Sequence, residues 1–266
     1  MTNDQTSDLS NTTKILVQLD DNIAQITINN PPANTWDIES LGGLSFTLKN
    51  LSLLENITAL VIHGQGEKFF SAGADLNQFA EGDKLAALEV ANCFSNAFES
   101  LASFKGVTIA AINGYAMGGG LECALACDIR IMEEQAQVAL PEASVGLLPC
   151  AGGTQRLAWL VGEAWATKLI LLGQRMDAVT AEKTGLVIEV AKQGQALETA
   201  LNYAQKTSKQ SPDALFACKR LLTSAREATI KDALKKERTE FVELINGENQ
   251  LEGTNSFLEK RKPVWK

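Results

Sequence analysis

Glu122 stands where a carboxylate could do acid–base chemistry beside an anion-binding loop. It follows three consecutive glycines in the segment NGYAMGGGLECALACD, residues 113–128, and falls in the first turn of an expected helix. The free N–H groups of Gly118–Gly120 can bind an anion or a developing oxyanion. A phosphate loop is disfavoured because no Lys-Ser/Thr pair follows the glycines and the G-x-G-x-x-G spacing is missing. The alternative for Glu122 is structural, since acidic residues at this position often only complement the helix dipole.

Glu142 is a second candidate, set in an apolar stretch. It follows a proline in the segment LPEASVGLLPCAGGTQR, residues 140–156, among several aliphatic side chains. If this segment is buried, desolvation raises the pKa of the carboxyl group toward that of a useful general acid. The alternative is a surface glutamate in a loop.

A third segment, KFFSAGAD at residues 68–75, places Gly73 between small residues after an expected strand. Small residues let backbone N–H groups approach a ligand closely, although an ordinary turn has the same composition. Together, two carboxylates and two N–H clusters supply the parts for adding water to a double bond conjugated with a carbonyl. One carboxylate removes a proton from water, the other delivers a proton to carbon, and the N–H groups hold the enolate oxygen. This chemistry requires no metal or redox cofactor.

The elements that must position these segments alternate between strand and helix. Runs of β-forming residues predict strands at 14–19, 23–28, 58–63, 107–112 and 128–132, the first two joined as a hairpin. Apolar residues at helical spacing predict a long helix over 84–104. Strands separated by helices imply crossover connections and a mostly parallel sheet, so the predicted fold class is α/β.

Only helices are expected beyond about residue 191. Ser211-Pro212 has the signature of an N-cap followed by a proline in the first turn, which opens a helix through Leu222. A later, densely charged helix carries an apolar stripe that includes Ile230 and Phe241. We therefore predict an α/β core at residues 12–191 and a helical region at residues 192–266.

The composition limits the partners and the compartment. A net charge of −8 over 266 residues argues against a nucleic-acid surface, which needs basic side chains to neutralise phosphates. No apolar run reaches the length of a membrane span, and the polar N-terminus has no secretory h-region. Five cysteines without zinc-ribbon spacing predict reduced thiols in a cytoplasmic protein with no metal site. The one histidine, His63, makes a Ser-His-Asp or Cys-His triad a poor explanation.

At its three glycine-bearing segments the chain resembles the crotonase superfamily, and within it the enoyl-CoA hydratases. The resemblance runs from INNPPANTWD at residues 28–37 to FLEKRKP at residues 257–263. The motifs SAGADL, NGYAMGGGLE, LPEASVGLLP and AGGTQRL occur in the order and spacing of the family. The resemblance implies a spiral core of βαβ units and a helical C-terminal region that builds homotrimers, often paired into hexamers. It also implies an acyl-CoA thioester substrate and no separate cofactor, because CoA is part of the substrate.

The resemblance implies a role for each matching residue. The oxyanion donors would be the backbone N–H groups of Ala74 and Gly119, Glu142 would deliver the proton to carbon, and Glu122 would help to activate the water. The implied activity is reversible syn addition of water to a trans-2-enoyl-CoA, giving a 3-hydroxyacyl-CoA. The further substrate-binding positions are Ala72, Asp75, Leu76, Gly118, Leu140 and Cys150. The alternatives are another crotonase-fold acyl-CoA lyase or isomerase, many of which lack one carboxylate, and a catalytically silent CoA-binding member.

The chain departs from the family pattern near the expected site. Cys150 stands where the family usually has glycine, and a positive φ there would strain a side chain. Leu140 replaces a frequent polar residue and is expected to make the wall more apolar. Trp36 and the helix over 84–104 are expected to shape the acyl pocket with it. The length and branching of the acyl chain, and the metabolic pathway, are not readable from these residues.

A second departure concerns the nucleotide of CoA. Asn77 stands where a lysine often approaches it. We hypothesise that a basic tail binds the CoA phosphate instead, across a subunit boundary, through Lys260, Arg261, Lys262 and Lys266. The alternative is a solvated helix end.

Overall fold

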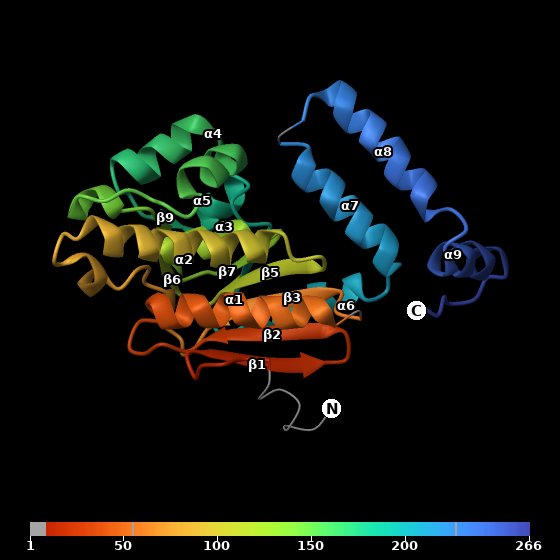
Figure 1. Ribbon diagram of the computed structural model, residues 1–266, viewed down its shortest axis with the longest axis horizontal. Coiled ribbons are helices and arrows are strands. Elements are labelled where there is room, and N and C mark those ends of the chain that lie inside the picture. Colours follow the sequence, from red (N-terminus) through yellow and green to blue (C-terminus); the bar gives the residue numbers. More distant parts are fainter. Residues whose placement is uncertain (1–8, 55, 227) are drawn as a thin grey trace.

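The computed structural model of the protein (Figure 1) describes residues 9–54, 56–226 and 228–266, which form two β-sheets with helices around them. The strands of the larger sheet lie in the order β1-β2-β3-β5-β7-β10. Their bounds are Ile15–Asp20, Ile23–Ile28, Ala59–Gly64, Val107–Ile112, Ile129–Glu133 and Glu189–Ala191. β1 pairs antiparallel with β2, and every later pair is parallel. The predicted hairpin, the mostly parallel sheet and the α/β class are confirmed.

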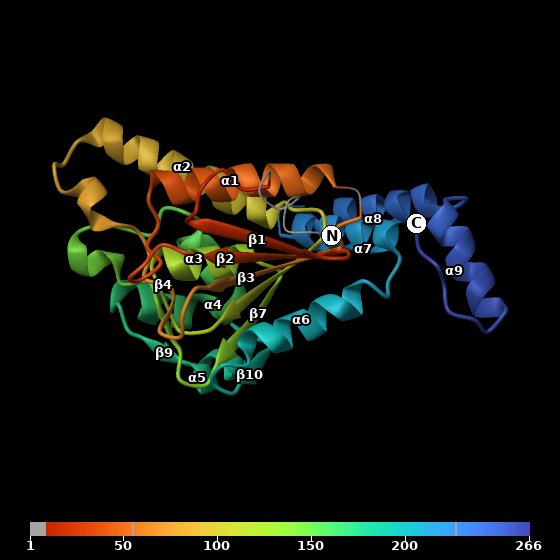
Figure 2. The same cartoon turned by 90° about the horizontal axis from the view of Figure 1, so that it is seen from below.

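Helices cover both faces of the larger sheet (Figure 2). On one face lie α1 (Ile38–Leu53) and α2 (Lys84–Ala102), whose apolar sides join the main core. On the other face lies α6 (Ala196–Thr207), which packs through alanines at every fourth position, Ala196, Ala200 and Ala204. Residues four apart share one side of a helix, and their small side chains let α6 approach the strands closely. The central strands β3 and β5 are buried on both faces and are nearly continuous apolar runs in the sequence, whereas the edge strand β1 alternates between buried and exposed residues.

A smaller sheet carries the three segments of chemical interest. Its order is β4-β6-β8-β9, with bounds Phe69–Ser71, Tyr115–Met117, Gln137–Ala139 and Met176–Asp177. β4, β6 and β8 run parallel, and each follows a strand of the larger sheet, namely β3, β5 and β7. This repeat of long strand, short strand and helix is the predicted spiral of βαβ turns. Parallel strands end at a common edge, so the segments that follow β4, β6 and β8 meet there.

Helices begin at this edge of the smaller sheet. The 3-10 helix η1 (Leu76–Phe79) and then α2 follow β4, and α3 (Gly119–Ala126) follows β6. The 3-10 helix η2 (Glu142–Val145) and α4 (Gly153–Leu171) follow β8. β9 runs antiparallel to β8, so α5 (Ala178–Lys183), which follows β9, begins at the opposite edge. The N–H groups at the start of these helices have no partner inside the helix and are available to other groups.

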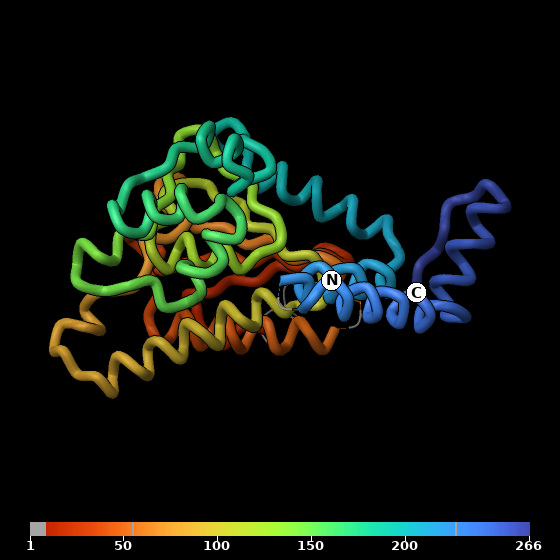
Figure 3. Tube along the Cα trace, turned by 90° about the horizontal axis from the view of Figure 1, so that it is seen from above, coloured from red at the N-terminus to blue at the C-terminus, as the bar shows by residue number. Residues whose placement is uncertain are grey.

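Three further helices, α7 (Pro212–Ser224), α8 (Ile230–Leu244) and α9 (Glu248–Leu258), extend from the end of the core that lies opposite the start of α2 (Figure 3). Ser211 caps α7 and Pro212 occupies its first turn, as predicted. The predicted helical C-terminal region is therefore confirmed. The division at residue 191 stays a prediction, and α6 beyond it packs on the sheet, so the projecting part begins with α7. No helix in the described ranges is both long and apolar enough to cross a membrane.

Candidate active site

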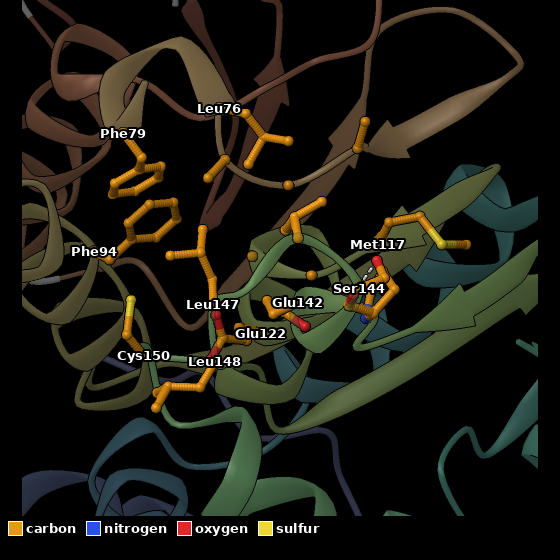
Figure 4. A pocket seen from close by; sticks show the side chains of 17 residues that line it. Leu76, Phe79, Phe94, Met117, Glu122, Glu142, Ser144, Leu147, Leu148 and Cys150 are labelled. Atoms are coloured by element: carbon orange, nitrogen blue, oxygen red, sulfur yellow. Dashed lines mark hydrogen bonds between the residues drawn. The ribbon is translucent and has the colours of Figure 1, made fainter. Parts of the chain in front are cut away.

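The segments after β4, β6 and β8 enclose a cavity of about 170 Å³ (Figure 4). Most of the predicted site residues line it: Ala72, Ala74, Leu76, Gly118, Gly119, Glu122, Glu142 and Cys150. Both glutamates project into this one cavity, although twenty positions separate them in the chain. The structure therefore brings together the two carboxylates and the two glycine-bearing segments that the sequence singled out.

Two predicted site residues, Asp75 and Leu140, lie outside the cavity wall. Asp75 caps η1, because its Oδ1 accepts hydrogen bonds from the backbone N–H and the side-chain amide of Asn77 at 3.0 and 2.8 Å. Leu140 is fully buried, and a β-carbon built on Gly153 would come within 3.0 Å of its Cδ1. Leu140 thus supports the loop behind the cavity instead of forming the wall, since the chain turns after β8 and directs its side chain into the core.

Glu122 is held by the loop that starts α4. The residue lies in the first turn of α3 and is only 2% exposed. Its Oε1 accepts hydrogen bonds from the N–H groups of Ala151 and Gly153, each at 2.8 Å. Burial raises the pKa of this carboxyl group, while the two N–H donors and the charge of Arg156 oppose the rise. Both bonds engage Oε1, which leaves Oε2 as the oxygen that can accept a proton from water.

Glu142 has a contrasting environment. Its Oε2 is buried and has no hydrogen-bond partner in the described structure. Burial raises the pKa of the Glu142 carboxyl group to about 7, and the negative charge of Glu122 acts in the same direction. A buried carboxyl oxygen without a donor favours the protonated form. Glu142 is therefore the group in this cavity that can hold a proton at neutral pH and release it.

Glycine is required at two positions beside the carboxylates, because neighbouring atoms lie too close there for a side chain. A β-carbon on Gly118 would come within 2.9 Å of Glu142 Oε1, and Gly118 also has a positive φ of 52°. A β-carbon on Gly73 would come within 2.7 Å of the Met117 carbonyl oxygen and 3.3 Å of the Gly119 nitrogen. The turn after β4 and the start of α3 therefore lie against each other, which only glycine at these positions permits.

Where the turn after β4 meets the start of α3, two backbone N–H groups take no part in the hydrogen bonds of the neighbouring backbone. The Gly119 N–H opens α3 and has no partner inside the helix. Beside Ala74, the bonds run from the Trp36 N–H to the Gly73 oxygen and from the Asp75 N–H to the Trp36 oxygen. These bonds leave out the Ala74 N–H itself, which has no partner among the described residues. Ala74 and Gly119 thus offer two donors in a wall of the same cavity.

The remaining wall is mostly apolar, and only part of it was predicted from the sequence. Phe94 of α2 and Leu147 and Leu148 beyond η2 lie in stretches that we expected near the site. Met117 and Ser144 lie in such stretches too but were not named as site residues, and Phe79 was not named either. Phe79 had a usable signal, because it follows Leu76 by three positions, the spacing that places two side chains on one face of a helical turn. Trp36, which we expected in the pocket, is fully buried behind it, with its ring edge-on to Phe98.

Cys150 lines the cavity mouth without backbone strain. It is absent from the non-glycine residues with positive φ in the described chain, so the departure from glycine costs no left-handed conformation. Although the residue is exposed, burial around the sulfur raises the pKa of the thiol to about 11, with the charges of both glutamates adding to the rise. The thiol is therefore neutral at physiological pH.

No three His, Cys, Asp or Glu side chains in the described residues are arranged to hold a metal ion. His63 lies at the end of β3, where its ring contacts the hydroxyl group of Thr27 at 2.9 Å, and it does not line the cavity. The absence of a cofactor stays a prediction.

The basic tail turns back on α9, far from β6 and α3, whose junction lines the cavity (Figure 1). Arg261 donates to Glu252 and Glu259, and Lys266 pairs with Glu248 at 3.2 Å. The charge of Arg261 is thus largely neutralised by Glu252 and Glu259. Binding of CoA phosphate by this tail stays a prediction, and it requires the site of another subunit.

A spiral of βαβ turns whose edge holds two carboxylates and two free N–H donors defines a class of acyl-thioester enzymes, and comparison with known proteins agrees. Residues 18–266 match the family described as enoyl-CoA hydratase/isomerase. The chain is 38% identical to 2,3-dehydroadipyl-CoA hydratase from Escherichia coli (strain K12), over 95% of this chain and 98% of that protein. It is 39% identical to a probable enoyl-CoA hydratase from Bacillus subtilis (strain 168), over 95% and 98% of the two chains.

Among solved structures, that of Pseudomonas aeruginosa DspI superposes with a TM-score of 0.94 at 57% identity, covering 96% of this chain and 97% of that one. The chain belongs to the enoyl-CoA hydratase/isomerase family of the crotonase superfamily. It is an enzyme of the hydratase type, a lyase that acts on acyl-CoA thioesters.

Proposed function

We propose that this enzyme catalyses the reversible syn addition of water to a trans-2-enoyl-CoA, giving a 3-hydroxyacyl-CoA. The observation that carries the proposal is the pair of carboxylates in one cavity with unlike environments. Glu122 is gripped by two N–H donors that favour its ionised form, whereas Glu142 has a buried oxygen without a donor and a pKa of about 7. Hydration needs one base and one acid, and this cavity offers one of each.

In the proposed reaction each group has a distinct role. The N–H groups of Ala74 and Gly119 donate to the thioester oxygen and stabilise the enolate that forms when C3 is attacked. Glu122 takes one proton from the water while the water oxygen bonds to C3. Glu142 gives its proton to C2, on the same face of the double bond. The proton on Glu122 then returns to Glu142 through solvent, which restores the starting state.

The alternatives within the family use fewer of these groups. An isomerase or another lyase needs a base and an oxyanion hole, but it does not need two carboxylates around one water. A catalytically silent CoA-binding member needs neither carboxylate in the cavity. Two glutamates in one cavity with different hydrogen-bonding environments therefore favour hydration over both alternatives.

We also propose that the chain assembles as a homotrimer or as a hexamer made of two trimers. None of the residues of α8 is buried in the single chain, and it exposes Ile230, Phe241 and Val242. Exposed apolar side chains along a helix that projects from the core are typical of a subunit interface. Sedimentation of the purified protein tests this assembly, and a monomer at micromolar concentration would contradict it.

The decisive experiment follows the loss of the conjugated-thioester absorbance when the purified protein meets crotonyl-CoA. We expect turnover by the wild type and a loss of about 10²-fold to 10⁴-fold in both Glu122→Gln and Glu142→Gln. Glu134→Gln, which changes an exposed glutamate, is the matched control and should keep wild-type activity. Binding of crotonyl-CoA without turnover by the wild type would overturn hydration of this substrate and would leave another acyl chain or the silent CoA-binding member. No binding would contradict both hydration of crotonyl-CoA and the silent CoA-binding member.

A further inference from the structure

Arg156 is a cation in an unfavourable place, and the proposed mechanism gives it no role. It lies in the first turn of α4, where the positive end of the helix dipole repels a cation. The side chain is half-buried, and desolvation lowers the pKa of the guanidinium. A cation that is both partly desolvated and at the wrong end of a helix does not stabilise α4, so its position points to another role.

The guanidinium lies on the loop that grips Glu122. Arg156 Nη1 donates to the carbonyl oxygen of Ala151 at 3.1 Å. A β-carbon on Gly152 would come within 2.7 Å of the same Nη1, so the guanidinium packs directly over this glycine. Gly152 has a φ of 97°, which lets the chain turn so tightly that the N–H groups of Ala151 and Gly153 both reach Glu122 Oε1. One short turn therefore connects Arg156 on one side with Glu122 on the other.

The charges around the pair come from several elements. Glu99 of α2 attracts Arg156, Arg226 beyond α7 repels it, and Cys127 at the end of α3 also faces it. Glu142 and Cys150 share the cavity with Glu122. Arg156 is the cation whose charge lowers the pKa of Glu122 against the effect of burial.

We propose that Arg156 is a positioning residue for Glu122: its guanidinium holds the 151–153 turn in the shape that grips the carboxylate, and its charge favours the ionised form. This inference rests on the proposed function only in naming Glu122 as the base. Arg156 does not line the cavity, so it acts on the reaction through Glu122 and not through the substrate.

Two substitutions separate the hydrogen bond from the charge. Arg156→Lys keeps the charge and loses the planar fork, whereas Arg156→Gln keeps a donor and loses the charge. Arg175→Gln, on an exposed arginine outside the cavity wall, is the matched control. We expect kcat for crotonyl-CoA to fall on the order of 10-fold in both Arg156 variants because the carboxylate is misplaced, with KM within about twofold of wild type.

The pH profile distinguishes positioning from a merely structural role. A base must be ionised, so activity falls as the pH drops through the pKa of Glu122. Loss of the cation raises this pKa, so the acid limb of the kcat profile moves to higher pH in Arg156→Gln and stays in place in Arg156→Lys. An equal loss of kcat in both variants with an unmoved acid limb would overturn the proposal.

A second measurement does not depend on turnover. The carboxyl carbon of Glu122 can be titrated by NMR in the full chain with ¹³C-labelled glutamate, with the signal assigned by its loss in Glu122→Gln. The titration midpoint should rise in Arg156→Gln and match wild type in Arg175→Gln. An unmoved midpoint contradicts the inference even if hydration is confirmed, and a raised midpoint supports it even if crotonyl-CoA is not hydrated.

Discussion

Glu122 and Glu142 line the same cavity, yet the chain treats the two carboxylates in opposite ways. Glu122 is almost completely buried but has two backbone donors on one oxygen, supplied by a helix start. Glu142 is less buried but has an oxygen with no donor at all. The difference teaches that hydrogen bonds, and not depth alone, set how far burial raises the pKa of a carboxyl group.

The strongest test of this contrast is the double variant. Each single change to glutamine removes one of two groups that act in the same step, so the effects should not add. We expect Glu122→Gln with Glu142→Gln to lose little more kcat than the worse single variant, which itself loses about 10²-fold to 10⁴-fold. Steady-state hydration of crotonyl-CoA measures this. If the two losses multiply, Glu122 and Glu142 contribute independently. This result would contradict a single step in which one carboxylate is the base and the other is the acid.

The second test displaces each carboxylate by adding a methyl group at the glycine that lies against it. Gly118→Ala would bring a methyl group within 2.9 Å of Glu142 Oε1, and Gly153→Ala would do the same to Glu122 Oε1. We expect kcat to fall in both, by roughly 10-fold to 100-fold, because small displacements of a reacting group are costly. Gly118→Ala should also lower the melting temperature more, since its φ is positive and that of Gly153 is not. Thermal unfolding beside kinetics separates the two effects. Gly42→Ala, at a helix site with open space, is the control.

The third test uses pH and stability. The pKa of Glu142 is raised from 4.5 to about 7 in the folded protein, so the folded state keeps a proton that the unfolded chain loses between these values. Its contribution to stability is therefore present below about pH 4.5 and is lost as the pH rises toward 7. Glu142→Gln should gain about 1–2 kcal/mol over wild type at pH 8, after allowance for partial exposure, and nothing at pH 4.5. Urea unfolding at both pH values measures it. A gain that is equal at both would show that Glu142 titrates normally.

The smallest expected effect concerns Cys150. Its thiol is neutral at physiological pH because its pKa is raised to about 11, so it neither donates charge to the cavity nor competes for the proton of Glu142. Cys150→Ala should change kcat less than about threefold, as expected for a substitution that alters no hydrogen bond or charge. The same crotonyl-CoA assay detects this. A large loss would give the sulfur a role in the reaction that its surroundings do not indicate.

Local sequence patterns determined much of this protein. Every strand predicted from a β-forming run matches an observed one to within one residue at either end, and Ser211-Pro212 marked the start of α7. Short-range patterns succeed here because they depend on intrinsic preference and on the spacing of apolar residues. Residue types and their surroundings singled out Glu122 and Glu142, and the motif resemblance added Ala74 and Gly119. The structure places all four around one cavity.

The tertiary structure alone decided how these residues are held. Leu140 and Trp36 both lie behind the cavity wall. The direction of their side chains depends on the packing of segments far apart in the chain. The donors to Glu122 come from Ala151 and Gly153, about thirty positions away. Arg156 supports the turn that carries these donors through its hydrogen bond to the Ala151 carbonyl oxygen. Residue types and spacing fix neither the direction of a side chain nor its desolvation. These follow only when the βαβ spiral brings three parallel strand ends to one edge, and in the proposed mechanism they distinguish the base, Glu122, from the acid, Glu142.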